Sequence, residues 1–209
     1  MDPVEETIKT FEKYADEYQN KYMSYVPYTD TYKPLSLLLG NDAVILDAAC
    51  GPGNIAKYLL DESPDRKIHG IDLSEKMVAL ARLTNPDATF EVKDCREISA
   101  LEGRYDGIVA GFCFPYLSRE EVDRFIGDAR EKLYPDGILY ISFMEGDYAA
   151  SGLQTRNGID WVCTYYHSAQ SLTDTLESTG FDVIDMVRKA FEREGEPAAV
   201  DVFIYARVR

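Results

Sequence analysis

Basic residues are scarce in this sequence. Its 209 residues include 22 Lys and Arg against 37 Asp and Glu, which gives a formal net charge of −15. Such an excess of acid repels phosphate backbones and anionic membrane surfaces. Long apolar runs are missing too: none approaches the ~20 residues of a membrane-spanning helix, and the first residues are acidic where a secretion signal is basic. We therefore expect a cytoplasmic protein that binds neither nucleic acid nor membrane.

Cysteine and histidine are also few. The four cysteines form no C-x-x-C pair, so neither a metal site nor a disulfide framework is indicated, and we expect reduced, mostly buried thiols. Internal repeats and low-complexity tracts are absent. A chain of this length buries one α/β core well and leaves little for a separate substrate domain, which predicts a single domain over residues 1–209.

One stretch, residues 43–60, organises the rest of the chain. Its letters AVILDAACGPGNIAKYLL join a short apolar run to a helical pattern through a loop that contains Gly51 and Gly53. The apolar run is too short for a buried helix and predicts a strand that ends at Asp47. Ligands of open α/β sheets bind beyond the carboxyl ends of the strands, so this loop is the expected site.

Two kinds of ligand fit this loop. Gly51, Gly53 and Ala56 satisfy the G-x-G-x-x-G/A pattern of dinucleotide sites. The carboxylate of Asp47 would repel a pyrophosphate there, but it suits a ligand with a cationic end, such as the ammonium and sulfonium of S-adenosylmethionine (SAM). The stretch from Asp47 to Gly53 resembles the D-x-G-x-G-x-G loop of class I SAM-dependent methyltransferases, with Ala49 in place of the first glycine.

Acids follow two further predicted strands. Lys67 to Ile71 precedes Asp72, and Phe90 to Val92 precedes Asp94. Parallel strands end at one edge of the sheet, so these carboxylates should lie near Asp47. In the family that the loop resembles, the second acid accepts the ribose hydroxyls and the third binds the adenine amino group, whereas a dinucleotide site needs only the middle one. The pattern therefore favours SAM over NAD.

The resemblance implies a fold and a set of cofactor contacts. The implied fold is α/β and Rossmann-like: a seven-stranded, mostly parallel sheet with an antiparallel last strand, helices on both faces and an N-terminal helical lid. Strands predicted over Phe181–Val187 and Val200–Val208, with an exposed connector over Glu192–Ala199, match its C-terminal end. The residues that the resemblance places against SAM are Tyr18, Asp47, Ala49, Gly51, Gly53, Asp72, Leu73, Met77, Asp94, Cys95, Gly111 and Phe112.

Residues 1–40 are expected to form that lid. Apolar residues recur at helical spacing on one stripe over residues 4–22, and a second helix is predicted over Tyr28–Leu39. Several tyrosines crowd this region, and a phenol ring buries apolar area while it keeps a polar hydroxyl, which suits a lid over a charged ligand. The run Phe11-x-x-x-Ala15-x-x-Tyr18 also resembles the helix that covers SAM in many small-molecule methyltransferases.

Two later segments are expected to face the methyl acceptor. Gly111 to Tyr116 follows the fourth predicted strand and lacks the [DN]-P-P-[YFW] signature of methylation on nucleic-acid bases; residues 146–167 carry an Asn157-Gly158 hairpin signal. An inserted hairpin there stands at the ligand edge, although simple packing on the sheet edge explains it nearly as well. The side chains expected against the acceptor are Tyr22, Tyr28, Phe114, Tyr116, Trp161 and Tyr165.

The chemistry places few demands on catalytic side chains. Methyl transfer from a sulfonium is an in-line displacement, so alignment of the reacting atoms and exclusion of water matter most. An acceptor hydroxyl or protonated amine benefits from a base, and His167 and Glu145 are the candidates by position. His167 is placed there because it follows Ile159, Trp161, Cys163 and Tyr165 in an alternation that puts one face of the second hairpin arm toward the acceptor. His69, on the second strand, is expected to be structural. No metal is expected.

These patterns predict a SAM-dependent methyltransferase that acts on an oxygen or nitrogen of a small-molecule metabolite. It is similar to the ubiquinone/menaquinone methyltransferase or glycine N-methyltransferase groups, and a monomer or homodimer is expected. Two alternatives stay open. One is a SAM-binding or interaction module of the same fold without turnover, which Ala49 would allow. The other is an NAD-linked oxidoreductase, for which a second domain and a Tyr-x-x-x-Lys pair in a suitable place are missing.

Overall fold

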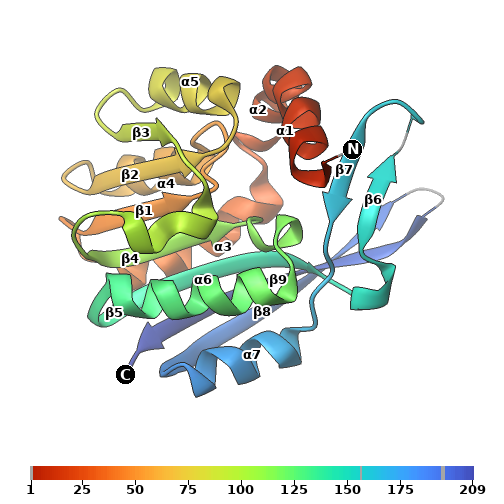
Figure 1. The fold of residues 1–209 in the computed structure, drawn as a ribbon. Coiled ribbons are helices and arrows are strands. Elements are labelled where there is room, and N and C mark those ends of the chain that lie inside the picture. Colours follow the sequence, from red (N-terminus) through yellow and green to blue (C-terminus); the bar gives the residue numbers. More distant parts are fainter. Residues whose placement is uncertain (1, 156, 194–195) are drawn as a thin grey trace.

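The computed structural model describes residues 2–155, 157–193 and 196–209. Seven strands form one sheet in the order β3-β2-β1-β4-β5-β9-β8 (Figure 1). Strands β1 to β5 run parallel, and β9 runs antiparallel to both of its neighbours, β5 and β8. This confirms the predicted sheet with its antiparallel last strand. The strands are β1 (Val44–Ala48), β2 (Lys67–Asp72), β3 (Thr89–Val92), β4 (Tyr105–Gly111), β5 (Leu133–Glu145), β8 (Phe181–Arg193) and β9 (Glu196–Val208).

Helices cover both faces of this sheet, because its central strands carry apolar side chains on both sides. On β1, Ile45 joins a core with side chains of α3, α4 and α5, and Leu46 joins a second core with side chains of α6 and α7. The helices are α3 (Val26–Leu38), α4 (Asn54–Glu62), α5 (Glu75–Thr84), α6 (Arg119–Lys132) and α7 (Ala169–Ser178), with short 3-10 turns η1 (Cys95–Ala100), η2 (Phe114–Tyr116) and η3 (Tyr148–Ala150).

Capping residues determine where the chain turns from a loop into a helix. Ser74 Oγ accepts the Met77 N–H at the start of α5. The spacing Ser118-x-x-Glu121 predicts a capping box, and these two residues form it at the start of α6. These caps satisfy the first backbone N–H groups of each helix, and they anchor the loops that line the sheet edge.

The N-terminal residues fold into α1 (Pro3–Lys13), α2 (Ala15–Tyr22) and α3. The predicted helical stripe over residues 4–22 is therefore divided, with a break at Tyr14 (φ −107°, ψ 17°). Lys13 Nζ and the Tyr14 hydroxyl both donate to the carboxylate of Asp160, at 2.8 and 2.7 Å. The break therefore coincides with a contact to the hairpin that no helical periodicity encodes.

A hairpin of β6 (Gly152–Thr155) and β7 (Trp161–Thr164) stands apart from the main sheet, beside α1 (Figure 1). The hairpin was predicted, with a first arm over Leu153–Arg156, of which Arg156 lies outside the described residues, and a second arm over Ile159–Tyr166, which is longer than β7. The exposed connector predicted over residues 192–199 was wrong. Strands β8 and β9 stay paired as far as Arg193 and Glu196, because an extended antiparallel ladder satisfies the backbone groups that a loop would leave open, and residues 194–195 lie outside the described part.

Three smaller expectations have clear outcomes. His69 is structural, with its ring nitrogens 3.2 Å from the Tyr105 hydroxyl and 2.9 Å from Glu91 Oε1. All four cysteines are free thiols, three of them buried. Within the described ranges, no helix combines the length and apolar character needed to cross a membrane.

Candidate active site

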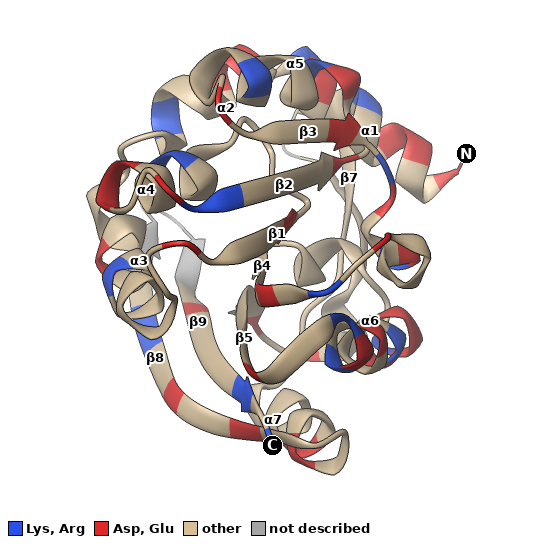
Figure 2. Ribbon diagram, turned by 90° about the vertical axis from the view of Figure 1, so that its left-hand side faces the viewer, with Lys and Arg blue, Asp and Glu red and all other residues tan. Residues whose placement is uncertain are grey.

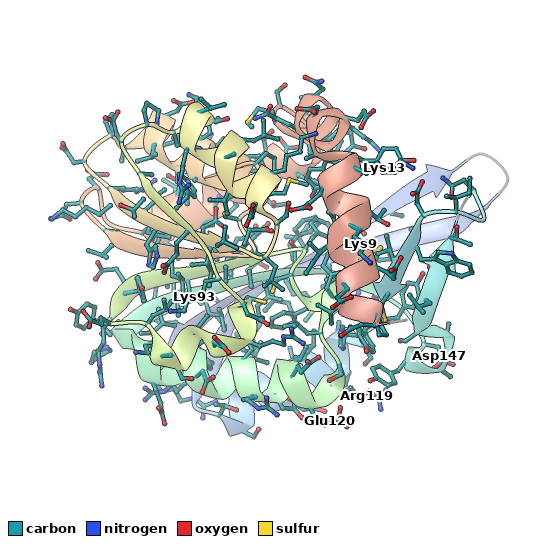
Figure 3. The ribbon with its side chains drawn as sticks, turned by 45° about the horizontal axis from the view of Figure 1, so that its top comes forward. Lys9, Lys13, Lys93, Arg119, Glu120 and Asp147 are labelled. Carbon is teal, nitrogen blue, oxygen red and sulfur yellow. The ribbon has the colours of Figure 1, made fainter. Side chains whose placement is uncertain are left out.

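A cavity of about 340 Å³ lies beyond the carboxyl ends of β1, β2 and β4. This volume is within the range of ~300–1,000 Å³ that is typical of small-molecule sites. The loops at the strand ends form its floor. Helix α1, which crosses this end of the sheet in Figure 3, supplies its roof. The roof side chains are Pro3, Val4, Thr7, Ile8 and Phe11.

The glycine loop on the floor has an unusual backbone. Ala49, Gly51 and Gly53 all have positive φ angles, of 56°, 54° and 79°. Such angles are open to glycine but strain alanine, by roughly 1–3 kcal/mol. A Cβ atom at Gly53 would lie 2.5 Å from the Asn85 side chain, so only glycine fits there. Ala49 thus occupies a position where glycine is the favoured residue.

Two of the three acids meet beneath the loop, at the adjacent ends of β1 and β2 (Figure 2). Asp72 accepts the backbone N–H groups of Gly51 and Ser74, both at 2.9 Å. Asp47 is 2% exposed, and its Oδ2 has no hydrogen-bond partner in the described part of the chain. Burial, and then the charge of Asp72, raises the pKa of Asp47 to about 7. A buried, unpartnered carboxylate oxygen is unfavourable unless a cation or donor arrives, which makes this atom a binding group.

The third acid is held by an arginine that the sequence reasoning missed. The Arg96 guanidinium contacts both oxygens of Asp94, at 2.5 to 2.9 Å, and it donates to Glu121 Oε1 at 3.0 Å. The pKa of Arg96 is raised, chiefly by its hydrogen bond to Asp94, so the guanidinium stays charged. The sequence pattern that could have revealed Arg96 is its position two residues after Asp94 at the end of a strand. Side chains two positions apart come together when the chain starts a turn between them.

The roof is tied to the hairpin by contacts one helical turn apart. The Cys163 N–H donates to Thr7 Oγ1 at 2.9 Å, and Thr10 Oγ1 donates to the Trp161 carbonyl at 2.8 Å. Lys13 continues this row and extends toward Asp160 of the hairpin (Figure 3). Lys13 and the Tyr14 hydroxyl lower the pKa of Asp160 to about 2. Helix α1 and strand β7 therefore close over the cavity as one unit.

Sequence comparison connects this site to a family. A sequence model described as "Methyltransferase domain" matches residues 45–137, from β1 into β5, and this range contains all three acids. The matched segment, residues 45–137, belongs to the methyltransferase-domain family, in line with the resemblance of its glycine loop to the class I SAM-dependent methyltransferase superfamily.

Curated relatives match part of their own length. The demethylmenaquinone methyltransferase of Thermotoga maritima is 28% identical over 64% of this chain and 59% of that protein. The dTDP-3-amino-3,6-dideoxy-alpha-D-glucopyranose N,N-dimethyltransferase of Streptomyces fradiae is 32% identical over 56% of this chain and 48% of that protein. The chain spans about half the length of these relatives.

Solved structures share the whole architecture. A SAM-dependent methyltransferase from Methanosarcina mazei superposes with a TM-score of 0.69 over 84% of this chain and 96% of that one, at 19% identity. At that identity the likeness shows the fold alone, and it includes the antiparallel end of the sheet beyond residue 137.

Most residues expected to hold SAM, the cofactor of this superfamily, do surround the cavity. Asp47 lies in a smaller adjoining cavity of about 30 Å³, whose walls include four tyrosines. Gly53 lines neither cavity, because Asn85 and Ala81 cover it. The expected residues on the wall of the larger cavity are Tyr18, Ala49, Gly51, Asp72, Leu73, Met77, Asp94, Cys95, Gly111 and Phe112.

The residues expected against the acceptor are only partly brought together. Tyr116 and Tyr165 line the larger cavity, and Tyr22 and Tyr28 line the smaller one. Phe114 lines neither: it is fully buried and packs on Phe125 and His167. Trp161 also lines neither cavity; its carbonyl holds Thr10 of the roof.

Neither predicted base reaches the cavities. His167 is 3% exposed, and its Nε2 lies 2.9 and 3.1 Å from the carbonyls of Phe114 and Leu117, so it donates to the η2 turn. Burial lowers the pKa of His167. Glu145 pairs with Arg188 at 2.8 Å and accepts the Ala169 N–H, which lowers its pKa. The prediction was wrong because β7 ends at Thr164, and the chain beyond it bridges back to the main sheet instead of continuing the alternation.

The site fits the cofactor of the superfamily. The orphaned Asp47 Oδ2 is suited to a cationic group, and Asp72 lies beside it with lone pairs left for hydroxyls after its two backbone contacts. Asp94 and Cys95 lie on the opposite wall, where an adenine would lie. In the described residues, no group of three or more His, Cys, Asp and Glu side chains is placed to bind a metal ion.

Proposed function

We propose that this chain transfers the methyl group of SAM to an oxygen or nitrogen atom of a small-molecule metabolite. One observation carries the proposal: Asp47 Oδ2, a buried carboxylate oxygen without a partner among the described residues, lies beside Asp72 in the small tyrosine-walled cavity that adjoins the larger one under α1. A pyrophosphate would be repelled by this pair of acids, whereas a ligand with a cationic end is attracted.

The chain's contribution is to bind, orient and exclude water. When bound, SAM supplies an electrophilic methyl group on a sulfonium. Asp47 would hold its cationic end, and Asp72 its ribose. Tyr18, from α2, packs over the glycine loop. Its ring lies 3.9 Å from the point at which a Cβ atom on Gly51 would stand. The roof of α1 keeps bulk water away from the reacting atoms. The acceptor atom is then held in line with the methyl group and the sulfur instead of being solvated.

Neither predicted base takes the proton of the acceptor, because His167 and Glu145 line neither cavity. The carboxylates that line the larger cavity are held by other groups, Asp72 by backbone N–H groups and Asp94 and Glu121 by Arg96. Burial raises the pKa values of Tyr18 and Tyr116, so both keep their hydroxyl protons at neutral pH. A neutral phenol holds a polar acceptor atom by hydrogen bonding and does not deprotonate it. With His167 and Glu145 outside the site, the reaction depends on positioning, and the acceptor reacts as a neutral nucleophile or loses its proton to solvent.

The walls favour a small, partly apolar acceptor. Phe11 and Tyr116 pack edge to face with ring centroids 5.2 Å apart, and Tyr165 and Cys163 close the side nearest the hairpin. A roof joined to the hairpin leaves no open groove for a folded polymer. The names of the relatives, a demethylmenaquinone methyltransferase and an amino-sugar N,N-dimethyltransferase, describe small molecules of very different kinds.

Calorimetry with S-adenosylhomocysteine (SAH), SAM and NAD tests the cofactor, and methyl transfer from labelled SAM to a metabolite panel tests the reaction. We expect saturable binding of SAH at micromolar concentration and none of NAD. Binding of NAD alone would overturn the proposal, and so would methylation of RNA, DNA or folded protein alone.

A second candidate, a binding module without turnover, is favoured by the strained Ala49 at φ 56°. The Ala49→Gly variant distinguishes the two functions. If alanine impairs the loop, glycine should tighten SAH binding several-fold; if the loop already works, the affinity should stay within about twofold.

A further inference from the structure

Two thiols meet in the wall of the larger cavity, and the proposed methyl-transfer step assigns no chemistry to either sulfur atom. Cys95 opens η1 directly after Asp94, and Cys113 follows Phe112 beyond the end of β4. Their Sγ atoms are 3.4 Å apart, although 18 positions separate the two residues in the chain. Both residues line the cavity.

The two thiols differ in how accessible they are from the cavity. Cys95 is half-buried and open to the cavity, whereas Cys113 is 1% exposed. The Cys113 S–H donates to the Cys95 sulfur, and this contact together with burial raises the pKa of Cys113. A small oxidant that enters the cavity therefore meets Cys95 first, with the Cys113 sulfur already in contact behind it.

The other cysteines serve as an internal contrast. Cys50 and Cys163 are also free, but neither has a sulfur neighbour at hydrogen-bonding distance among the described residues. The pairing at Cys95 and Cys113 is thus a local property of the floor, where the loops after β3 and β4 converge. We propose that these two residues form an oxidation site, at which a hydroperoxide converts the dithiol into a disulfide that closes the adenine side of the cofactor site.

The chemistry balances with hydrogen peroxide as the only co-reactant. The Cys95 sulfur attacks one peroxide oxygen, the O–O bond breaks, and a sulfenic acid and one water result. The Cys113 sulfur then attacks the Cys95 sulfur; the S–O bond breaks, the S–S bond forms, and a second water leaves with the Cys113 proton. Each sulfur loses one electron, and the peroxide gains both.

The disulfide would alter the floor. Bonded sulfur atoms lie about 2.05 Å apart, so the two side chains must close by more than an ångström. That movement pulls together the loops that carry Asp94, Arg96 and Phe112. Because adenine is assigned to this wall, we expect weaker cofactor binding after oxidation, and slower oxidation when SAH covers Cys95. This part rests on the proposed function; the formation of the disulfide does not.

The test is peroxide treatment of the reduced protein, followed by mass spectrometry. Trypsin should release Asp94–Arg96 linked to Tyr105–Arg119, with the loss of two hydrogen atoms, and a thiol reductant should restore both peptides. Cys95→Ser and Cys113→Ser should abolish this linkage, whereas Cys163→Ser, a matched change elsewhere on the cavity wall, should leave it intact. Independent oxidation of the two thiols, or a linkage to Cys50 or Cys163, would overturn the inference.

SAH calorimetry on reduced and oxidised protein gives the second measurement. We expect at least a tenfold loss of affinity on oxidation, reversed by reductant, and no such loss in Cys113→Ser compared with its own reduced form. An unchanged affinity in fully linked protein would overturn the closing role. If the linkage forms but reduced protein never binds SAH, the proposed function fails while the oxidation site stands.

Discussion

The floor and the roof of the cavity are built in different ways. The floor consists of loops anchored at the ends of parallel strands that are buried on both faces, and its central acid receives two backbone hydrogen bonds. The roof consists of α1 and the β6–β7 hairpin, which lie outside the main sheet and meet through polar side chains that range from the buried Thr7 to the exposed Lys13. A segment with few buried apolar contacts opens at lower free energy than a core strand. The floor is thus preorganised for binding, while the roof is the part able to admit ligands.

The largest expected effect lies in the floor. Asp72→Ala should weaken SAH binding about tenfold to a hundredfold, because charge-assisted hydrogen bonds of ~1.5–3 kcal/mol are lost. The same change leaves the N–H groups of Gly51 and Ser74 without an acceptor. Calorimetry measures the affinity, and Asp65→Ala, an exposed acid at the other end of the sheet, is the control. An unchanged dissociation constant in a folded Asp72→Ala protein would place Asp72 outside the site.

The second effect, at Asp47 in the floor, changes the free energy of unfolding and the affinity for SAH in opposite directions. In the folded protein the pKa of Asp47 is about 7, above its ordinary value of 3.8. The stability that Asp47 contributes is therefore fully present below pH 3.8, and it is lost as the pH rises through about 7. Asp47→Asn should remove this loss and raise the free energy of unfolding at about pH 8 by about 1–3 kcal/mol, while SAH binding weakens. Chemical denaturation at about pH 5 and pH 8 measures it. Equal pH dependence in both proteins would show that Asp47 does not titrate in this range.

A smaller effect is expected where the roof is buried. Thr7→Val keeps the shape of the side chain but leaves the Cys163 N–H without its acceptor, which should lower the free energy of unfolding by about 1 kcal/mol. Hydrogen exchange should accelerate in α1 and β7 and stay unchanged in β1. Thr29→Val, on the exposed start of α3, is the matched control. Equal acceleration in β1 would mean that roof and floor open together, and the comparison between them would fail.

The smallest effect belongs to the exposed end of the roof. Lys13→Met removes the ion pair to Asp160, which is solvent-screened. We expect SAH to dissociate up to about twofold faster at low salt, with the difference lost at high salt. Lys9→Met is the control, since Lys9, one turn before Lys13 on α1 (Figure 3), pairs with Glu6 of the same helix. A stopped-flow measurement compares them. Equal rates for both variants at low salt would show that this pair does not hold the roof.

The floor was predictable because its geometry follows from strands. Asp47, Asp72 and Asp94 each follow a short apolar run, and parallel strands must end at one edge, so sequence position alone implies proximity. The role of Arg96 in the site was not predicted, because its second partner, Glu121, lies 25 positions away and had been assigned only a capping role. Its place in the site depends on how α6 docks on the sheet.

The roof was predictable only as a helix. The spacing of Phe11 and Tyr18 indicated a covering segment, but the contacts of Thr7 and Thr10 join residues about 150 positions apart, as the separations of 156 and 151 show. No local pattern encodes such contacts. His167 was misplaced for a related reason: a two-residue alternation says which face a side chain takes only while the strand continues, and β7 ends three positions earlier.

The order of the last strands has a consequence for synthesis on the ribosome. Strand β8 precedes β9 in the chain, yet in the sheet β9 lies between β5 and β8, and among the described residues β8 pairs with β9 alone. As the chain emerges, the parallel strands β1 to β5 are already available to assemble, while β8 has no edge to join until β9 has followed it out. The nascent protein therefore passes through a stage in which the carboxyl edges that bind the ligand are complete and the β5 edge is bare. A chaperone that shields an unpaired strand edge would act at that stage.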